Sequence, residues 1–362
     1  NYGNTVSGIT TSNTVNLGTV TACGNSINTN GVYIAGSIDN NAVLWKDGVP
    51  TFLTNLPANG NQAAYAVRVM VYNDDIYVVG SEEESTNNTQ VSNIKLWKNG
   101  VLTNITNGTT YSEAYGLDIY NGDVYICGVD DNLNGNRVSK VWKNGVATIL
   151  FKDTFDFADP SNIKVVNGDV YVSGSATPKN PNSAYFSKAI YWKNGAINFL
   201  SNAANTKSFA SGIFENNGDL YFTGNENTIS ANSGVYWKNG VKTILTVSPT
   251  YTYTEPYYIY VVNTDVYVCG TQVQENQNSS YKLNAAYWKN NSLTLLTNYT
   301  AGGGTPYLYD IFVKNNIVYT IGETYQDNSS LVKPLCFQNN IPIPLTGFTN
   351  SQYVAAYGIF VK

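Results

Sequence analysis

The feature that most constrains the fold of this chain is a repeat that occurs seven times. Each repeat contains the frame Tyr-x-x-Gly with an aliphatic residue before the tyrosine, and successive tyrosines lie 44 to 52 residues apart. The seven pairs are Tyr33/Gly36, Tyr77/Gly80, Tyr125/Gly128, Tyr171/Gly174, Tyr221/Gly224, Tyr267/Gly270 and Tyr319/Gly322. Repeats of this length with strand-like sequence inside each unit are typical of a β-propeller. We therefore predict an all-β fold, a seven-bladed β-propeller with four antiparallel strands per blade.

The third repeat shows how one blade is built. Residues 116–128 alternate as two strands around an Asn-Gly pair at 121–122, and residues 138–150 as two more around an Asn-Gly pair at 144–145. Asn-Gly between alternating apolar runs is a strong hairpin signal, because both residues tolerate the positive φ of a tight turn. We name the four strands a to d in chain order. The tight a–b and c–d turns then share one face, the tight-turn face, and the longer b–c and d–a loops share the other, the long-loop face.

One large aromatic residue follows the glycine of each repeat. We expect these residues and the repeated tyrosines to pack between blades rather than to form a sugar-stacking array. The seven anchors are Trp45, Trp97, Trp142, Trp192, Trp237, Trp288 and Phe337. Most c–d turns carry a lysine, as in Lys143-Asn144-Gly145, and we interpret these lysines as solubilising edge charges.

The composition excludes several kinds of chemistry. The chain has no histidine, so histidine bases, Ser-His-Asp triads and histidine-bound metals are excluded. Its only arginines are Arg68 and Arg137, which argues against arginine clamps for carboxylate or phosphate. The formal net charge of −5 gives no electrostatic footprint for nucleic acid. We predict no catalytic residue, no metal site and no cofactor.

The four cysteines are predicted to be free thiols. Cys127 and Cys269 occupy the same position in repeats 3 and 6, on nearly opposite sides of a ring, whereas a disulfide needs Cα atoms within about 7 Å. Cys23 and Cys336 fall on different strands of neighbouring repeats. All four are expected to be small buried apolar residues.

The combination of Val-Tyr-Val-x-Gly with Tyr-Trp-Lys-Asn-Gly resembles a repeat found in secreted and cell-surface proteins of the Bacteroidota. The resemblance covers roughly residues 20–361, and both motifs occur in nearly every repeat. It implies an exported seven-bladed propeller, extracellular or at the cell surface, and it implies no activity.

One position is a candidate ligand-binding ring. Aligning the repeats on the residue before each tyrosine places a small or rigid residue ten positions upstream in all but the last, where it is Leu308, and the residue before it varies. These variable residues are Tyr65, Glu113, Asp159, Phe209, Glu255 and Tyr307. They lie where the chain reaches strand a from the long-loop face, so we expect them to ring the mouth of the central channel. Carboxylates interleaved with aromatic rings suit a carbohydrate or peptide ligand. The alternative is that they are solvated loop residues or cap channel water.

Acidic residues also follow the strand b glycines, at Glu82 to Glu84, Asp130, Asp131, Glu226 and Glu323. They make the long-loop face negative, and the simplest interpretation is solvated loop charge. Residues 130–136 start like a calcium loop, but Val141 stands where an EF-hand places its bidentate Glu. An Asn/Gly-rich turn is the simpler interpretation.

The two ends of the chain are expected to build one blade together. Residues 1–19 form an N-terminal extension, with 14–20 a candidate edge strand, and residues 20–362 form a single propeller. Residues 357–362 are an eighth copy of strand a, whereas the first copy has lost an aliphatic residue to Asn25. We predict that residues 356–361 pair with residues 32–36 and close the ring, since closed architectures avoid unpaired edges. A natural chain that continues past Lys362 is the competing interpretation.

Three functions remain open at this point. The first is a non-catalytic exported binding or scaffold module that binds glycan or protein at the long-loop face. The second is a glycan-active hydrolase or lyase whose acid and base are mouth carboxylates such as Glu113, Asp159 and Glu255. The third is a subunit of a larger cell-surface or secretion assembly. None of them involves nucleic acid or a membrane span.

Overall fold

The structure is a computed structural model of the chain. It describes residues 29–57, 60–86, 89–132, 136–150, 155–179, 187–201, 206–228, 231–275, 281–297, 304–326, 331–350 and 352–362. The predictions for residues 1–19, for the strand at 14–20, for Asn25 and for Cys23 lie outside the described residues.

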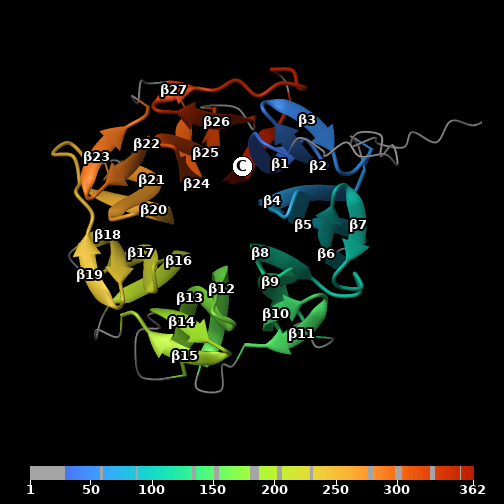
Figure 1. The fold of residues 1–362 in the computed structure, drawn as a ribbon, viewed down its shortest axis with the longest axis horizontal. Coiled ribbons are helices and arrows are strands. Elements are labelled where there is room, and N and C mark those ends of the chain that lie inside the picture. Colours follow the sequence, from blue (N-terminus) through green and yellow to red (C-terminus); the bar gives the residue numbers. More distant parts are fainter. Residues whose placement is uncertain are drawn as a thin grey trace, which may run out of the picture.

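The described residues form seven four-stranded antiparallel sheets arranged as a ring (Figure 1), which confirms the predicted seven-bladed propeller. Each sheet is one blade, with strands a to d in order from the channel outward. The a strands are β28 (Val354–Val361), β4 (Gln62–Tyr72), β8 (Ser112–Tyr120), β12 (Phe155–Val166), β16 (Lys207–Asn216), β20 (Tyr253–Val262) and β24 (Thr305–Lys314). The b strands are β1 (Val32–Ile38), β5 (Asp75–Thr86), β9 (Asp123–Asp130), β13 (Asp169–Pro178), β17 (Asp219–Asn227), β21 (Asp265–Glu275) and β25 (Ile317–Tyr325).

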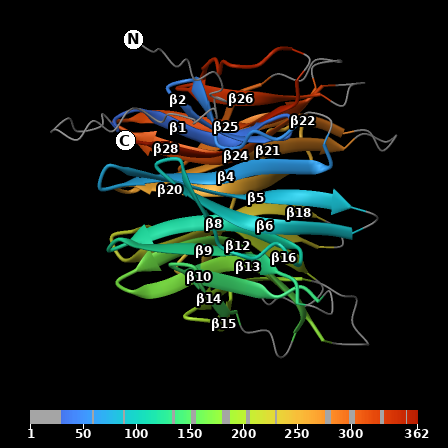
Figure 2. The same cartoon turned by 90° about the vertical axis from the view of Figure 1, so that its right-hand side faces the viewer.

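The outer half of each blade is shorter. The c strands are β2 (Asn41–Lys46), β6 (Thr89–Lys98), β10 (Ser139–Lys143), β14 (Lys188–Lys193), β18 (Asn232–Lys238), β22 (Tyr281–Lys289) and β26 (Val332–Gln338). The d strands are β3 (Val49–Phe52), β7 (Val101–Asn104), β11 (Val146–Ile149), β15 (Ala196–Phe199), β19 (Val241–Ile244), β23 (Ser292–Leu295) and β27 (Ile341–Pro342). Seen from the side, the blades stack around the ring with their loops projecting at the ends of the strands (Figure 2). Within the described part of the chain, no helix is long and apolar enough to cross a membrane.

The ring is closed by the two ends of the described chain. β28 pairs with β1, from Val32 opposite Val361 to Ile38 opposite Val354, as predicted. Gly31 and Lys362 exchange two backbone hydrogen bonds of 3.2 and 3.0 Å beyond the end of this pair. β28 is therefore the innermost strand of the first blade, and the C-terminus lies beside the channel (Figure 1).

Steric contact with strand a explains why each repeat has a glycine at the end of the Tyr-x-x-Gly frame. In every blade it lies opposite strand a, and a Cβ on it would collide with a backbone carbonyl of that strand, as Gly80 would with Tyr65 and Gly224 with Phe209. No side chain fits at this position, so the Tyr-x-x-Gly frame marks the close approach of strands a and b.

The repeated aromatic residues fill the core, as expected. All six tryptophans are at most 2% exposed, and Phe337 is buried. The tyrosines pack across blade boundaries, since Tyr125 clusters with Val172 of the next blade and Tyr221 with Val268 of the next. Sheet faces of neighbouring blades thus bury each other's apolar side chains.

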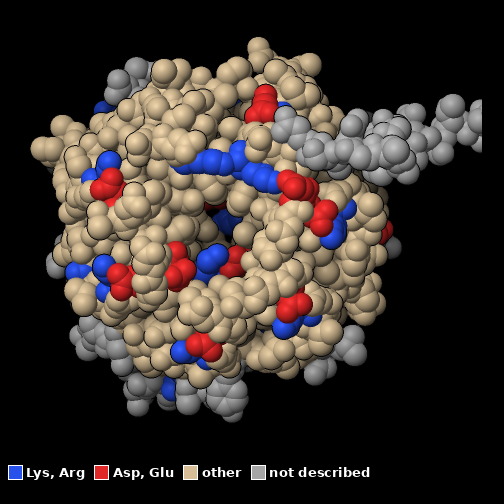
Figure 3. Space-filling view, in the orientation of Figure 1, with Lys and Arg blue, Asp and Glu red and all other residues tan. Residues whose placement is uncertain are grey.

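The tight-turn face carries a repeated polar latch. In the fifth blade, Lys238 Nζ lies 2.7 Å from Asp219 Oδ2 and 5.4 Å from the centre of the Tyr221 ring, and Asn239 Nδ2 donates to Asp219 Oδ1 at 2.7 Å. Asn239 Oδ1 also accepts the backbone N–H of Leu220 at 2.9 Å. The same Lys–Asp pair recurs as Lys98–Asp75, Lys143–Asp123, Lys193–Asp169 and Lys289–Asp265. The lysines therefore do more than solubilise an edge: they join the c–d turn to the a–b turn. Figure 3 shows this face, with basic and acidic atoms side by side around the rim.

The described cysteines agree with the thiol prediction. Cys127, Cys269 and Cys336 are free and buried, and burial raises the pKa of each thiol above its usual value.

Candidate functional site

The six predicted mouth residues occupy equivalent positions, one per blade, but they lie inside strand a rather than in the loop before it. The strand begins earlier than the sequence suggested, at Ser112 instead of Gly116 in the third blade. In each blade the residue after the mouth position lies opposite the repeated glycine, as Ala66 does with Gly80 and Pro256 with Gly270. In the first blade the mouth position is Ala355, which lies opposite Ser37, and the next residue, Ala356, lies opposite Gly36.

A β-bulge follows each mouth position. The register between strands a and b shifts by one residue in every blade, for example between Ala114 and Gly116. The bulged residues are Tyr357, Val67, Tyr115, Ser161, Ser211, Tyr257 and Tyr309. A bulge re-aims its side chain, and all seven of these residues line one cavity of about 350 Å³ in the channel, the axial cavity.

The sequence therefore pointed two residues upstream of the ring that lines the axial cavity. Of the six predicted residues, Glu113 alone also lines it. Tyr65 donates to Glu83 at 2.9 Å and its hydroxyl lies 3.3 Å from Glu113. Asp159 and Phe209 line neither the axial cavity nor the pocket described below. The sequence did contain the bulged residue, as the variable position directly after each aligned Ala or Pro. Residue propensities do not predict a bulge, so the alignment alone did not identify this position as the one that lines the cavity.

The bulged residues make the axial cavity asymmetric. Three consecutive blades contribute Tyr257, Tyr309 and Tyr357, with ring centroids 5.5 Å apart for the first pair and 5.9 Å for the second. The fourth and fifth blades contribute Ser161 and Ser211 instead. The arc thus spans three neighbouring blades, Ser161 and Ser211 make the adjoining wall small and polar, and Tyr115 and Val67 complete the ring.

Tyrosine hydroxyls at the mouth donate to carboxylates. Tyr115 and Tyr111 both donate to Glu113 Oε2 at 2.9 Å. Across the channel, Tyr309 donates to Glu323 Oε1 at 2.7 Å, and Tyr257 lies 3.5 Å from Glu255 Oε2. A hydroxyl that donates its proton to a carboxylate can still accept a hydrogen bond from a ligand through its oxygen.

The electrostatics of the mouth follow from burial. Burial, with nearby carboxylates, raises the pKa of Tyr115, Tyr257 and Tyr309 far above the usual tyrosine range, so these side chains stay protonated. Burial also raises the pKa of Glu255 and of Glu323. Glu323 is 2% exposed, and its Oε2 has no hydrogen-bond partner among the described residues. Glu323 is therefore a buried member of the site rather than the solvated loop charge suggested by the sequence.

A second hollow opens beside the axial cavity, between the sixth and seventh blades. This lateral pocket has a volume of about 380 Å³ and is lined by Tyr253, Glu255, Val273, Tyr281, Leu283, Thr305 and Tyr307. Glu255 of this pocket lies 3.5 Å from the hydroxyl of Tyr257, which lines the axial cavity. Two predicted mouth residues, Glu255 and Tyr307, thus lie together here.

Arg68 divides the channel. It lines both the axial cavity and a third hollow of about 310 Å³ toward the tight-turn face. Its Nη1 donates to the carbonyls of Tyr357 at 2.8 Å and Val67 at 3.1 Å, and its guanidinium carbon lies 5.5 Å from the Tyr258 ring centre. Asp310, also in this region, accepts the backbone N–H groups of Ile311 and Ile359. Burial raises the pKa of Asp310 to about 6, although Arg68 opposes the shift.

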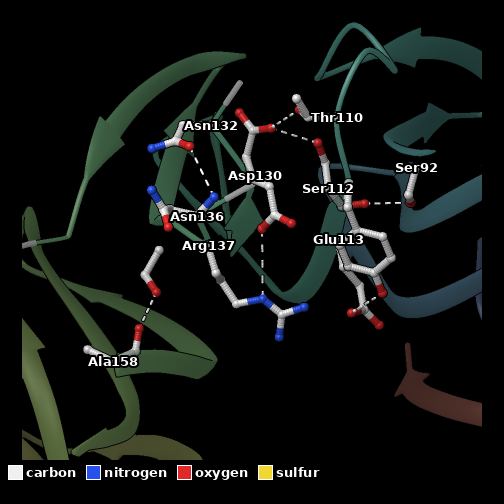
Figure 4. Close-up of polar contacts among 12 residues, drawn as sticks. Ser92, Thr110, Ser112, Glu113, Asp130, Asn132, Asn136, Arg137 and Ala158 are labelled. Atoms are coloured by element: carbon white, nitrogen blue, oxygen red, sulfur yellow. Dashed lines mark hydrogen bonds and ion pairs between the residues drawn. The ribbon is translucent and has the colours of Figure 1, made fainter. Parts of the chain in front are cut away.

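The segment that begins like a calcium loop has its carboxylates held by protein groups (Figure 4). Asp130 accepts from Ser112 at 2.8 Å and Thr110 at 3.1 Å, and its other oxygen lies 2.6 Å from Lys140 Nζ. Arg137 Nε lies 3.9 Å from an oxygen of Asp131. Residues 133–135 lie outside the described residues. In the described part of the chain, no group of three or more acidic or cysteine side chains could hold a metal ion.

Comparison with known proteins supports the fold alone. No protein-family model matches the chain, and no match is found among curated proteins. A puromycin-hydrolysing peptidase of Mycobacterium tuberculosis is similar in structure, with a TM-score of 0.52 at 8% identity over 88% of this chain. This chain covers 53% of that peptidase, about half its length. The β-propeller domain of the trilobed protease of Pyrococcus furiosus gives a TM-score of 0.46 at 9% identity, covering 80% of this chain and 94% of that one. The Bacillus subtilis arabinanase Arb43A gives 0.34 at 12% identity over 63% of this chain and 98% of that one.

Proposed function

We propose that this chain is a non-catalytic, exported binding module that takes a glycan or a protein segment at the mouth of its channel. The observation that carries the proposal is the ring of seven bulged residues. They converge on one cavity from every blade, yet they differ in chemistry from blade to blade. A ring that served only to close the channel has no need of an aromatic arc on one side.

The surface chemistry of the axial cavity suits a ligand with many hydrogen-bond donors and a flat apolar face. Tyr257, Tyr309 and Tyr357 offer rings for stacking. Tyrosine oxygens and carboxylates offer acceptors, and the hydroxyls that donate to Glu113 and Glu323 fix the rings in place. Both sugars and peptide backbones meet these requirements.

A hydrolase is the second candidate, because burial raises the pKa of Glu255 and this residue lines the open lateral pocket. A carboxylic acid with a raised pKa can act as a general acid. Release of reducing ends from a polysaccharide would establish this function, and loss of that release in Glu255→Gln would assign the acid.

The test of the binding proposal combines glycan and peptide arrays with two matched variants. The mouth variant carries Glu113→Ala, Glu255→Ala and Tyr257→Ala, because these side chains line the axial cavity or the lateral pocket. The control variant carries Lys98→Ala, Lys193→Ala and Lys238→Ala on the tight-turn face. We expect any ligand of the wild-type chain to be lost by the mouth variant and kept by the control. Unchanged binding of the ligand by the mouth variant would refute the placement.

A further inference from the structure

Glu255 stands in an environment that leaves its charge uncompensated. Its carboxylate is partly buried, and its hydrogen bonding within the described residues is limited to the long contact of 3.5 Å from the Tyr257 hydroxyl. Among the described residues that line the lateral pocket, none is a lysine or an arginine. Glu113, by contrast, accepts from the hydroxyls of Tyr111 and Tyr115, both at 2.9 Å. A buried carboxylate without partners is costly, so this pocket favours a bound group that supplies positive charge.

The walls around Glu255 are aromatic. The rings of Tyr253, Tyr281 and Tyr307 line the pocket, together with Thr305 and the buried Val273 and Leu283. The Tyr307 ring is fixed by its neighbours: it stacks on Tyr309 at 6.4 Å and meets Tyr257 edge-on at 6.5 Å. Aromatic faces attract cations through their quadrupole, most strongly where water is displaced.

The size and donor set of the lateral pocket narrow the kind of cation. Its volume of about 380 Å³ far exceeds the roughly 30 Å³ occupied by one water, so it has room for an organic group. A hard metal ion needs several oxygen ligands, whereas one carboxylate lines this pocket. An anion would be repelled by Glu255, and a neutral group would leave its charge unpaired.

We propose that the lateral pocket binds an alkylammonium group, with its charge at Glu255 and its methylene or methyl groups against Tyr253, Tyr281 and Tyr307. The inference deepens the proposed function and rests on it, because the pocket opens beside the axial cavity and would recognise a cationic substituent of the ligand held there. An amino or choline substituent on a glycan and a lysine side chain of a protein share this chemistry.

Ligand-observed NMR titration of the full chain tests the charge requirement directly. The probes are choline and 3,3-dimethyl-1-butanol, which has the same shape but carbon in place of the charged nitrogen. We expect saturable binding of choline and at least tenfold weaker binding of the alcohol. Equal binding of the two, or no binding of choline, Nα-acetyl-lysine amide or glucosamine, overturns the proposal. Preference for the lysine amide over glucosamine would indicate a protein source of the ammonium group, and the reverse order a glycan source.

Variants locate the binding. Glu255→Gln keeps the shape and removes the charge, and we expect it to weaken choline binding at least tenfold. Tyr281→Ala, at a side chain that is 53% exposed and so harmless to folding, should weaken it about fivefold. The control is Glu226→Gln, since Glu226 lies on the same face but is paired with Lys242. It should change affinity less than twofold. Wild-type affinity in Glu255→Gln overturns the proposal. If array ligands still depend on the mouth while choline does not bind, this inference fails and the proposed function stands.

Discussion

The two faces of this propeller use the same strands in opposite ways. On the tight-turn face, five blades repeat one arrangement in which a lysine, an aspartate, an asparagine and a tyrosine satisfy one another. On the long-loop face, equivalent positions hold different residues, and carboxylates such as Glu255 and Glu323 are left incompletely paired. Where each blade repeats the same contacts, those contacts build the scaffold. Where the blades diverge around one cavity, the differences give that cavity its chemistry, and they cost stability.

The largest expected effect comes from breaking the scaffold at its closure. Deleting residues 353–362 removes β28, leaves β1 with an unpaired edge and removes the carbonyl of Tyr357 that Arg68 contacts. We expect the melting temperature to fall by more than about 10 °C, since several kcal/mol are lost at once. Circular dichroism melts of the truncated and full chains measure it. Tyr357→Phe, which keeps the strand, is the control and should melt within a few degrees of wild type.

Next in size is a contrast between two glycines. In Gly224→Ala the new methyl would collide with the backbone of Phe209, so we expect a loss of at least about 3 kcal/mol. Gly122 has a φ of 85° but no atom within 4 Å of the added Cβ, so Gly122→Ala should cost roughly 1–2 kcal/mol from backbone strain alone. Urea unfolding of both variants compares them. A smaller loss for Gly224→Ala than for Gly122→Ala would show that the strands approach less closely than described.

A pH-dependent effect of similar size is expected at Asp310. Because burial raises the pKa of this carboxyl to about 6, from about 3.9 in the unfolded chain, the folded state binds the proton more tightly. Its contribution to stability is fully present below about pH 4 and is lost as the pH rises through about 6, by up to about 3 kcal/mol. Asp310→Asn cannot titrate. Between pH 4 and 7 the wild type should therefore lose unfolding free energy relative to this variant. A difference in unfolding free energy that stays constant over this range would contradict the assignment.

The latch on the tight-turn face should give the smallest stability effect. Asn239→Ala removes hydrogen bonds of 2.9 and 2.7 Å that join the two turns. We expect its loss in urea unfolding to exceed that of the control by about 1 kcal/mol, the usual net value of such bonds in a partly exposed site. Asn217→Ala serves as the control, because Asn217 is exposed and has a positive φ of 54°, close to the 47° of Asn239, but lies in the a–b turn outside this hydrogen-bond pair. Equal losses in the two variants would show that the latch adds nothing to the hairpins.

The sequence predicted what is repeated better than what diverges. The blade count, the buried tryptophans and the pairing at the closure follow from periodicity and apolar patterning, which act over one repeat. The ring of bulged residues did not, because a single-residue shift such as that at Tyr257 depends on how strands a and b meet. The lateral pocket could be predicted even less from the sequence, since Glu255, Tyr281 and Tyr307 come together only when two blades pack. The latch aspartates, such as Asp219, were visible in the turns but gain meaning only from the lysine across the blade.

The central claim is that the repeated face stabilises and the divergent mouth binds. The most direct test measures both properties on two single variants, Glu255→Gln and Asn239→Ala, by choline titration and by urea unfolding. We expect Glu255→Gln to lose at least tenfold in choline affinity while its unfolding free energy does not fall, because a strained charge is removed. We expect Asn239→Ala to lose at least about 1 kcal/mol of stability, from its hydrogen bonds and from the positive φ at this position, with unchanged affinity. Loss of affinity in Asn239→Ala together with wild-type affinity in Glu255→Gln would contradict the account.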